Sequence, residues 1–255
     1  MDFGIRGKVA LVTGASSGIG EAVARALARE GVRLAVAARR RDRLEALAKE
    51  ATTLGATDAR AFHLDLEDAA SVTTLTAEVR SVLGDIEILV ANIGGPKPGT
   101  FLELGLDAWD AGYRGALRSM LQLVGAVVPA MRDRRWGRIV ALTSSSVKQP
   151  IPNLALSNAY RTALVAALKT LSIETAPFGI TVNAIATGRV LTGRLRNLYG
   201  SDEAVHAAAR TEIPIARVAT PDEFAPMVVF LCSRPAGYVT GQTIAVDGGL
   251  IRSLY

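Results

Sequence analysis

Residues 13–20 read Thr-Gly-Ala-Ser-Ser-Gly-Ile-Gly and directly follow a short apolar run, Val9–Val12. The alanine-rich segment after them, Glu21–Glu30, is typical of a helix. A strand, a glycine-rich turn and a helix start bring free backbone N–H groups and the positive end of the helix dipole to one place, where a phosphate can bind. The spacing G-x-x-x-G-x-G departs from the G-x-G-x-x-G dinucleotide pattern, and a glycine cluster alone is often only a turn. The flanking elements favour a nucleotide site, with these expected contacts: Gly14, Ser16, Ser17, Gly18, Ile19 and Gly20.

Strand-like and helix-like segments alternate along the whole chain, which predicts a parallel sheet with helices on both faces. The expected strands are Val9–Thr13, Arg33–Ala38, Ala59–Leu64, Ile86–Ala91, Arg138–Thr143, Thr181–Ala186 and Thr243–Val246. The expected later helices are Asp42–Leu54, Glu67–Leu83, Asp107–Arg134, Leu154–Ala176 and Pro221–Cys232. Right-handed crossovers then give one α/β domain over residues 1–255, a Rossmann-type doubly wound sheet of about seven strands with ligands at the strands' carboxyl ends. Residues 188–213 form the least regular stretch, expected as a mobile lid on the substrate side or as an ordinary surface excursion.

The composition fits one globular domain, because the 255 residues are 49% hydrophobic and 21% charged. The net charge of +5 raises the question of nucleic acid, but the arginines are spread, and the cluster at residues 132–138 is best explained as a solvated helix end. No apolar run approaches the roughly 20 residues that span a bilayer, and the opening residues show no signal-peptide pattern. The single cysteine, Cys232, allows no internal disulfide. We expect a cytoplasmic protein with no nucleic-acid partner, membrane partner or metal site.

The end of the second expected strand indicates which dinucleotide binds. A carboxylate at this position would bind the 2′-hydroxyl of the adenosine ribose, whereas an arginine accommodates a 2′-phosphate. The chain has Arg39 and Arg40 here, and no acid before Asp42. Exposed cations at a helix start are unfavourable by the dipole argument, so a phosphate partner explains them better than solvent does. The pattern favours NADP(H) over NAD(H).

Asp65 and Leu66 follow the third expected strand. The Asp65 carboxylate could accept a hydrogen bond from the adenine amino group. It could instead cap the helix expected to begin near Glu67. The sequence leaves both roles open.

Several further motifs accompany the turn at residues 13–20. They are Asp65-Leu66, Ala91-Asn92-Ile93-Gly94, Gly137-Arg138-Ile139-Val140 leading to Ser144, Ile180-Thr181-Val182-Asn183, Tyr238-Val239-Thr240-Gly241 and Val246-Asp247-Gly248-Gly249. With them the chain resembles the short-chain dehydrogenase/reductase family along essentially its whole length, and within it the beta-ketoacyl-carrier-protein reductase-like branch. The resemblance implies a Rossmann-type domain, a nicotinamide dinucleotide, a small-molecule substrate and a homotetramer or dimer. It also implies these further cofactor contacts: Asn92, Gly94, Arg161, Gly188 and Val190.

The expected active site departs from the family pattern. The family uses an Asn-Ser-Tyr-Lys tetrad, with Tyr and Lys spaced Y-x-x-x-K on one helix. Here Ser157 stands at the tyrosine position, Arg161 at the lysine position and Ala116 at the asparagine position, so only the serine remains, as Ser144. This variant, together with the neighbouring Gly-Gly-Pro of residues 94–96, is similar to a reductase-like subgroup of the family.

The substituted residues allow some of the family's chemistry but not all of it. Arg161 can keep the lysine's electrostatic and ribose-binding work, yet its pKa above about 12 prevents proton donation. Ser157 can orient a substrate oxygen without protonating it efficiently, and Ser144 can hydrogen-bond the same oxygen. Tyr160 lies about 60° around the helix from Ser157, so its phenol either reaches Arg161 or simply packs.

Three functions remain open. The first is an NADP(H)-dependent oxidoreductase, 3-oxoacyl-reductase-like, whose proton comes from water, from Tyr160 or from the substrate. The second is a catalytically silent dinucleotide-binding sensor or partner subunit. The third is a lyase or dehalogenase that reuses Ser144 and Arg161. The intact glycine turn and the retained polar groups favour the first. The sequence leaves the substrate open, and an acidic or phosphorylated substrate would meet Lys97 or Arg189.

Overall fold

A single parallel sheet of seven strands runs through the computed structural model, which describes residues 2–254, with strand order β3-β2-β1-β4-β5-β6-β7. The strands are β1 (Val9–Thr13), β2 (Arg33–Ala38), β3 (Asp58–His63), β4 (Ile88–Asn92), β5 (Gly137–Leu142), β6 (Ile180–Thr187) and β7 (Thr243–Val246). The order reverses between β1 and β4, and in a sheet of this kind ligands bind outside the carboxyl ends at such a point. The predicted fold class is confirmed.

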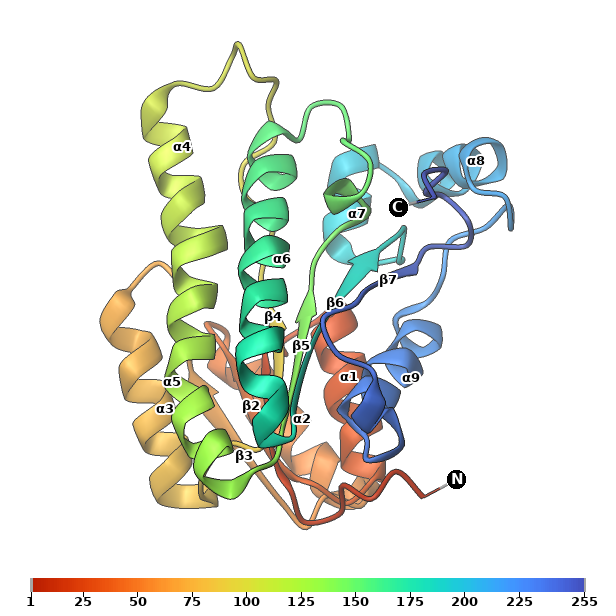
Figure 1. The fold of residues 1–255 in the computed structure, drawn as a ribbon. Helices are drawn as coiled ribbons and strands as arrows, with labels where there is room; N and C mark the ends of the chain where they lie inside the picture. The colour runs from red at the N-terminus through yellow and green to blue at the C-terminus, as the bar shows by residue number, and fades with distance from the viewer. Residues whose placement is uncertain (1, 255) are drawn as a thin grey trace.

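Helices cover both faces of the sheet (Figure 1). On one face lie α3 (Ala69–Leu83), α4 (Leu106–Gly112), α5 (Ser119–Arg134) and α6 (Ala155–Thr175), and on the other α1 (Gly18–Arg29), α2 (Arg41–Leu54) and α9 (Pro221–Cys232). Alternate residues of a strand serve the two cores: Val12 packs with α1 and α9, while its neighbour Leu11 packs with α3 and α5. Among residues 2–254, no helix combines the length and apolar character needed to cross a membrane.

The predicted boundaries hold for β1, β2, β7 and α9 and shift elsewhere. The helix expected from Glu67 begins at Ala69, because the Asp68 carboxylate accepts a hydrogen bond from the N–H of Ala70 at 2.9 Å and caps it there. The single helix expected over residues 107–134 is interrupted by a π-helical segment, Tyr113–Arg118.

The stretch 188–213 is more regular than predicted. It contains α7 (Gly193–Tyr199) and α8 (Asp202–Glu212), which lie beyond the end of β6 (Figure 1). Val205, Ala209 and Ile213 form a small core of their own. The expectation of an irregular segment is therefore wrong, because the periodic pattern is split between two short helices. Movement of this stretch as a lid stays a prediction.

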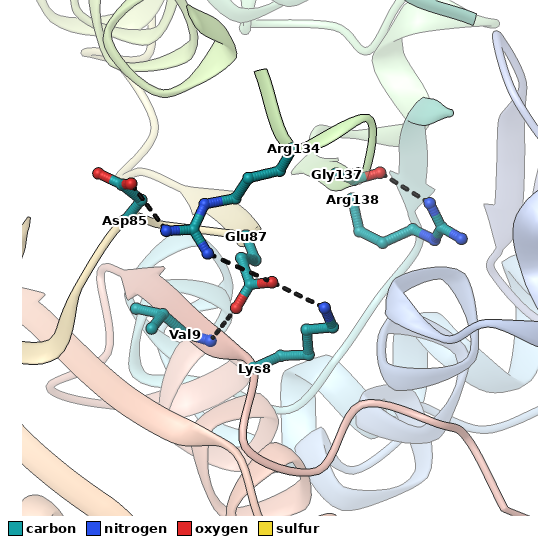
Figure 2. A network of polar contacts seen from close by, with 7 residues as sticks. All are labelled: Lys8, Val9, Asp85, Glu87, Arg134, Gly137 and Arg138. Atoms are coloured by element: carbon teal, nitrogen blue, oxygen red, sulfur yellow. Dashed lines mark hydrogen bonds and ion pairs between the residues drawn. The ribbon is translucent and has the colours of Figure 1, made fainter. Parts of the chain in front are cut away.

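A polar network ties together the amino-terminal side of the sheet (Figure 2). Glu87, which precedes β4, is buried and accepts hydrogen bonds from Lys8 Nζ at 2.7 Å and from the N–H of Val9 at 3.1 Å. Arg134 at the end of α5 pairs with Asp85 at 2.8 Å. These contacts join the starts of β1 and β4 to α5. The network lies at the opposite ends of the strands from the glycine-rich turn.

Candidate functional site

The glycine-rich turn joins β1 to α1 at the carboxyl edge of the sheet. Gly14 and Gly18 have φ angles of +60° and +59°, in the left-handed region that favours glycine. A Cβ atom on Gly20 would collide with the carbonyl oxygen of Gly14. Ser17 is the N-cap residue of α1, yet within the described chain its side chain makes no capping hydrogen bond, so the first N–H groups of the helix keep no side-chain acceptor. The close approach and the free helix start fit a dinucleotide phosphate.

Asn92, the last residue of β4, holds the turn in place. Its Nδ2 donates to the carbonyl oxygen of Gly14 at 3.3 Å. Its N–H donates to the Thr13 hydroxyl at 2.9 Å, and that hydroxyl donates back to the Asn92 carbonyl at 2.8 Å. Asn92 is therefore positioned to support the turn from the neighbouring strand. Gly94, two residues further on, is exposed beside it.

Arg40 folds onto the glycine-rich turn. Its Nη2 donates to the Ser17 hydroxyl at 2.7 Å and to the Ser16 hydroxyl at 2.9 Å. Both predicted arginines are exposed, and of the two it is Arg40 whose side chain contacts the turn in the described chain. Binding of a 2′-phosphate by Arg39 and Arg40 stays a prediction. The guanidinium places a positive charge next to the free start of α1.

Asp65 follows β3 and takes up a local turn. Its Oδ1 accepts a hydrogen bond from the N–H of Glu67 at 3.0 Å, and its own N–H donates to the Ser71 hydroxyl at 2.9 Å. The N-cap of α3 is Asp68, so the capping role considered for Asp65 is wrong. Leu66 is half-buried beside it. The interaction with adenine stays a prediction.

Ser144 follows β5 and opens a short 3-10 turn. Its Oγ accepts a hydrogen bond from the N–H of Ser146 at 3.2 Å, which leaves the Ser144 hydroxyl proton free to donate. The Oγ of Ser146 is buried and has no hydrogen-bond partner in the described chain. Two serine hydroxyls thus gather at the end of β5.

Arg161 and Ser157 are both buried on α6, four residues apart and so on the same side of the helix. Arg161 is 6% exposed, and its Nη1 donates to the carbonyl oxygen of Leu142, the last residue of β5, at 3.1 Å. Burial, and next the charge of Arg194, lowers the pKa of Arg161 to about 10. The guanidinium therefore remains charged at neutral pH.

Tyr160 lies away from Arg161. Its hydroxyl donates to the carbonyl oxygen of Trp109 in α4 at 2.8 Å, and the two rings meet edge to face with centroids 5.8 Å apart. Burial, and next the charge of Asp110, raises the pKa of the phenol. The structure does not bring Tyr160 to the predicted catalytic group, because α4 offers it both an acceptor and an aromatic partner.

The structure gives the surroundings of three remaining positions, and the cofactor contacts expected of Gly188 and Val190 stay predictions. Ala116 is buried in the π-helical segment and brings no amide to the site. Gly188 packs so closely on Asp247 that a Cβ atom would collide with it. Val190 is buried and bridges to Ala219. These contacts fix the path of the chain after β6.

Two residues near α7 escaped the sequence analysis. Thr192 caps α7 and lies against the glycine-rich turn, with its Cγ2 3.1 Å from where a Cβ on Gly18 would stand. Arg194 Nη1 donates to the carbonyl oxygen of Gly95 at 3.1 Å. The threonine before a helix-compatible run was the available signal, since threonine is a good N-cap residue.

The sheet order, the switch between β1 and β4 and the glycine-rich turn define a dinucleotide-binding domain of the Rossmann class. Within residues 2–254, no cluster of three or more His, Cys, Asp or Glu side chains is arranged to hold a metal ion. Residues 14–251 match the family model described as enoyl-(acyl carrier protein) reductase. The chain belongs to this short-chain dehydrogenase/reductase family and is an oxidoreductase.

Relatives of known activity match nearly the whole chain. The 3-oxoacyl-[acyl-carrier-protein] reductase FabG of Escherichia coli is 35% identical over 246 residues, covering 96% of this chain and 97% of the relative. The 2,3-dihydro-2,3-dihydroxybenzoate dehydrogenase of Bacillus subtilis is 32% identical over 253 residues, covering 96% and 97%. The solved L-sorbose reductase of Gluconobacter frateurii, complexed with NADPH and L-sorbose, has a TM-score of 0.94 and 33% identity over 100% of both chains. The predicted family membership is confirmed.

Proposed function

We propose that this oxidoreductase uses NADP(H) in preference to NAD(H). The observation that carries the proposal is Arg40, whose guanidinium reaches Ser16 and Ser17 beside the free start of α1. A 2′-phosphate would bring negative charge to this point, and the residues that end β2 offer no carboxylate for a ribose hydroxyl. The NADPH complex of L-sorbose reductase supports the same choice.

We further propose that the nicotinamide exchanges a hydride with the carbonyl carbon of a small, 3-oxoacyl-like substrate or with the corresponding alcohol. In reduction, Ser144 donates its free hydroxyl proton in a hydrogen bond to the carbonyl oxygen. The fixed charge of Arg161 stabilises the negative charge that develops on this oxygen, and its free donors can bind the cofactor ribose. Ser157 orients the same oxygen from the α6 side.

The proton that completes the alcohol comes from water or from the substrate. Arg161, with a pKa of about 10, keeps its proton at neutral pH. Tyr160 donates to the Trp109 carbonyl and has a raised pKa. A positioned general acid contributes about 100- to 10,000-fold to a rate. We therefore expect turnover slower, by a factor in this range, than in relatives that keep the phenol.

Nucleotide titration followed by a turnover assay tests the proposal. NADPH and NADH are titrated separately, and NADPH consumption is then measured with an acetoacetyl thioester as the probe. Tighter binding of NADPH together with turnover supports the proposal. Binding without turnover of any carbonyl compound leaves the second candidate, a dinucleotide sensor or partner subunit, which the missing phenol favours. Binding of neither nucleotide overturns both.

We also propose a homo-oligomer, dimer or tetramer, that works in the cytoplasm. The support for assembly is an apolar surface around α4 and α5, where Leu106 is 83% exposed, Tyr113 45% and Leu121 40%. The lone thiol, Cys232, is buried and free, which suits a reducing compartment. Light scattering of the wild type and of Leu121→Asp tests assembly: a smaller mass for the variant supports this face, and a monomeric wild type contradicts the oligomer.

A further inference from the structure

Two arginines meet the carboxyl ends of neighbouring strands. Arg161 donates to the carbonyl oxygen of Leu142 in β5, and Arg194 donates to that of Gly95, each at 3.1 Å. Leu142 is the register partner of Asn92 in β4, and Gly95 follows Asn92 by three residues. The two guanidinium groups therefore lie at the same edge of the sheet, one from α6 and one from α7.

Neither guanidinium has an anionic partner in residues 2–254. Nearby arginines do: Arg189 pairs with Glu212, and Arg196 pairs with Asp202 at 2.7 Å. None of the ion pairs in this part of the chain includes Arg161 or Arg194. Burial lowers the pKa of both groups, and the charge of Arg194 further lowers that of Arg161. Holding the buried Arg161 cation near the charge of Arg194 costs free energy, which a bound anion would offset.

We propose that Arg161 and Arg194 form a subsite for an oxyanion, carboxylate or phosphate, carried by the substrate. The inference rests on the proposed function and defines its substrate class as anionic carbonyl compounds. Arg161, 6% exposed, forms the fixed inner wall. Arg194 is an exposed residue of α7 whose guanidinium lies over Gly95 and forms the outer wall. Planar guanidinium groups bind carboxylate and phosphate with paired, charge-assisted hydrogen bonds.

The two cations considered from the sequence are poorer candidates. The Arg189 guanidinium is paired with Glu212 and lies over the Tyr199 ring, 5.1 Å from its centroid. Lys97 is exposed on the loop after β4. Neither lies beside a second unpaired guanidinium that is buried, whereas Arg194 acts on the buried Arg161.

Matched pairs of charged and neutral carbonyl compounds test the subsite. The probes are pyruvate, acetoacetate and levulinate against their methyl esters, and dihydroxyacetone phosphate against dihydroxyacetone. Dissociation constants are measured by calorimetry on NADP⁺-loaded protein, in which a ketone cannot be reduced. We expect the anion of at least one pair to bind about 10- to 100-fold more tightly, the range for hydrogen bonds to charged groups. The acid and phosphate arms show which oxyanion is preferred.

Substitutions of two arginines on α7 show whether Arg194 causes the preference for anionic compounds. Arg194→Gln should reduce the anion preference to less than about threefold, and Arg194→Lys should retain part of it. Arg196→Gln is the matched control, because Arg196 is on the same helix but is paired with Asp202. It should keep the wild-type preference. The NADP⁺ dissociation constant should stay within about twofold in all three variants.

The possible failures are distinguishable. No anion preference in any pair overturns the subsite, and so does an Arg194→Gln variant that weakens NADP⁺ as much as the anion, since the arginine would then serve the cofactor. A wild type that binds no dinucleotide contradicts the proposed function. The same compounds titrated against cofactor-free protein would still support or overturn the subsite.

Discussion

Replacing Arg40 by serine should convert a protein that prefers NADPH into one that discriminates weakly. The guanidinium donates to the hydroxyls of Ser16 and Ser17 at 2.9 and 2.7 Å, and these contacts hold it beside the turn. A 2′-phosphate in front of the guanidinium would gain one or two charge-assisted hydrogen bonds. Such bonds contribute about 1.5–3 kcal/mol when protected, but Arg40 is exposed and exposed ion pairs contribute about 1 kcal/mol or less. A net loss of about 1–2 kcal/mol corresponds to a 5- to 30-fold weaker NADPH complex.

The assay is a fluorescence titration of NADPH and NADH at low and high salt. The NADH constant should change less than about twofold, and the loss for NADPH should shrink at about 1 M salt, where the Debye length is near 3 Å. Arg41→Ser is the control, because Arg41 pairs with Glu45 at 2.8 Å on the solvent side of α2. An equal weakening of both nucleotides by Arg40→Ser would refute the reasoning, since Arg40 would then only support the turn. An unchanged NADPH constant would refute it as well.

Four further outcomes are expected. Ser144→Ala should lower kcat about 100-fold with NADPH binding unchanged, and a KM effect alone would contradict its role at the reacting oxygen. Tyr160→Phe should leave kcat within about twofold, because the phenol is bound to the Trp109 carbonyl, and a larger loss would make it the proton donor. Glu87→Ala should lower the free energy of unfolding by about 1–3 kcal/mol in urea titrations while NADPH binding persists in the folded protein. Anion binding should be constant from about pH 6 to 9 and decline above the Arg161 pKa of about 10, because the cation is lost as pH rises; a decline already near pH 7 would contradict this assignment.

Local signals made the nucleotide end of the fold predictable. The turn at residues 13–20 needs glycine for its own backbone geometry, and the apolar run before it is a buried strand, so both follow from short-range rules. The end of β2 and the start of α2 are equally local, which is why the sequence could single out Arg40 as a candidate for phosphate binding. The sequence offered Asp65 as a possible cap of α3, but the cap is Asp68, and this choice depends on three-dimensional geometry that the spacing does not contain.

The substrate end of the site depends on contacts between distant segments. The direction of the Tyr160 side chain is set by the Trp109 carbonyl, 51 residues earlier in the chain. The position of Arg194 depends on Gly95, 99 residues away, which has no Cβ and so lets a guanidinium lie on its backbone. The periodicity of apolar residues within one segment carries no information about either of these long-range contacts. It also cannot distinguish the π-helical segment from the helices on each side, because the apolar pattern runs through all three.

The hydrogen bond from Arg161 ends on a main-chain oxygen, and this has a consequence for how the site can change over evolution. The Leu142 carbonyl is present whatever side chain occupies that position, so mutations along β5 leave the acceptor in place. Neighbouring residues are then free to vary and to reshape the substrate's surroundings while a positive charge stays at the same point. A family member can thereby lose its acid–base residues and still keep this positive charge in the site. Its substrate selectivity can then change while the charge stays in place.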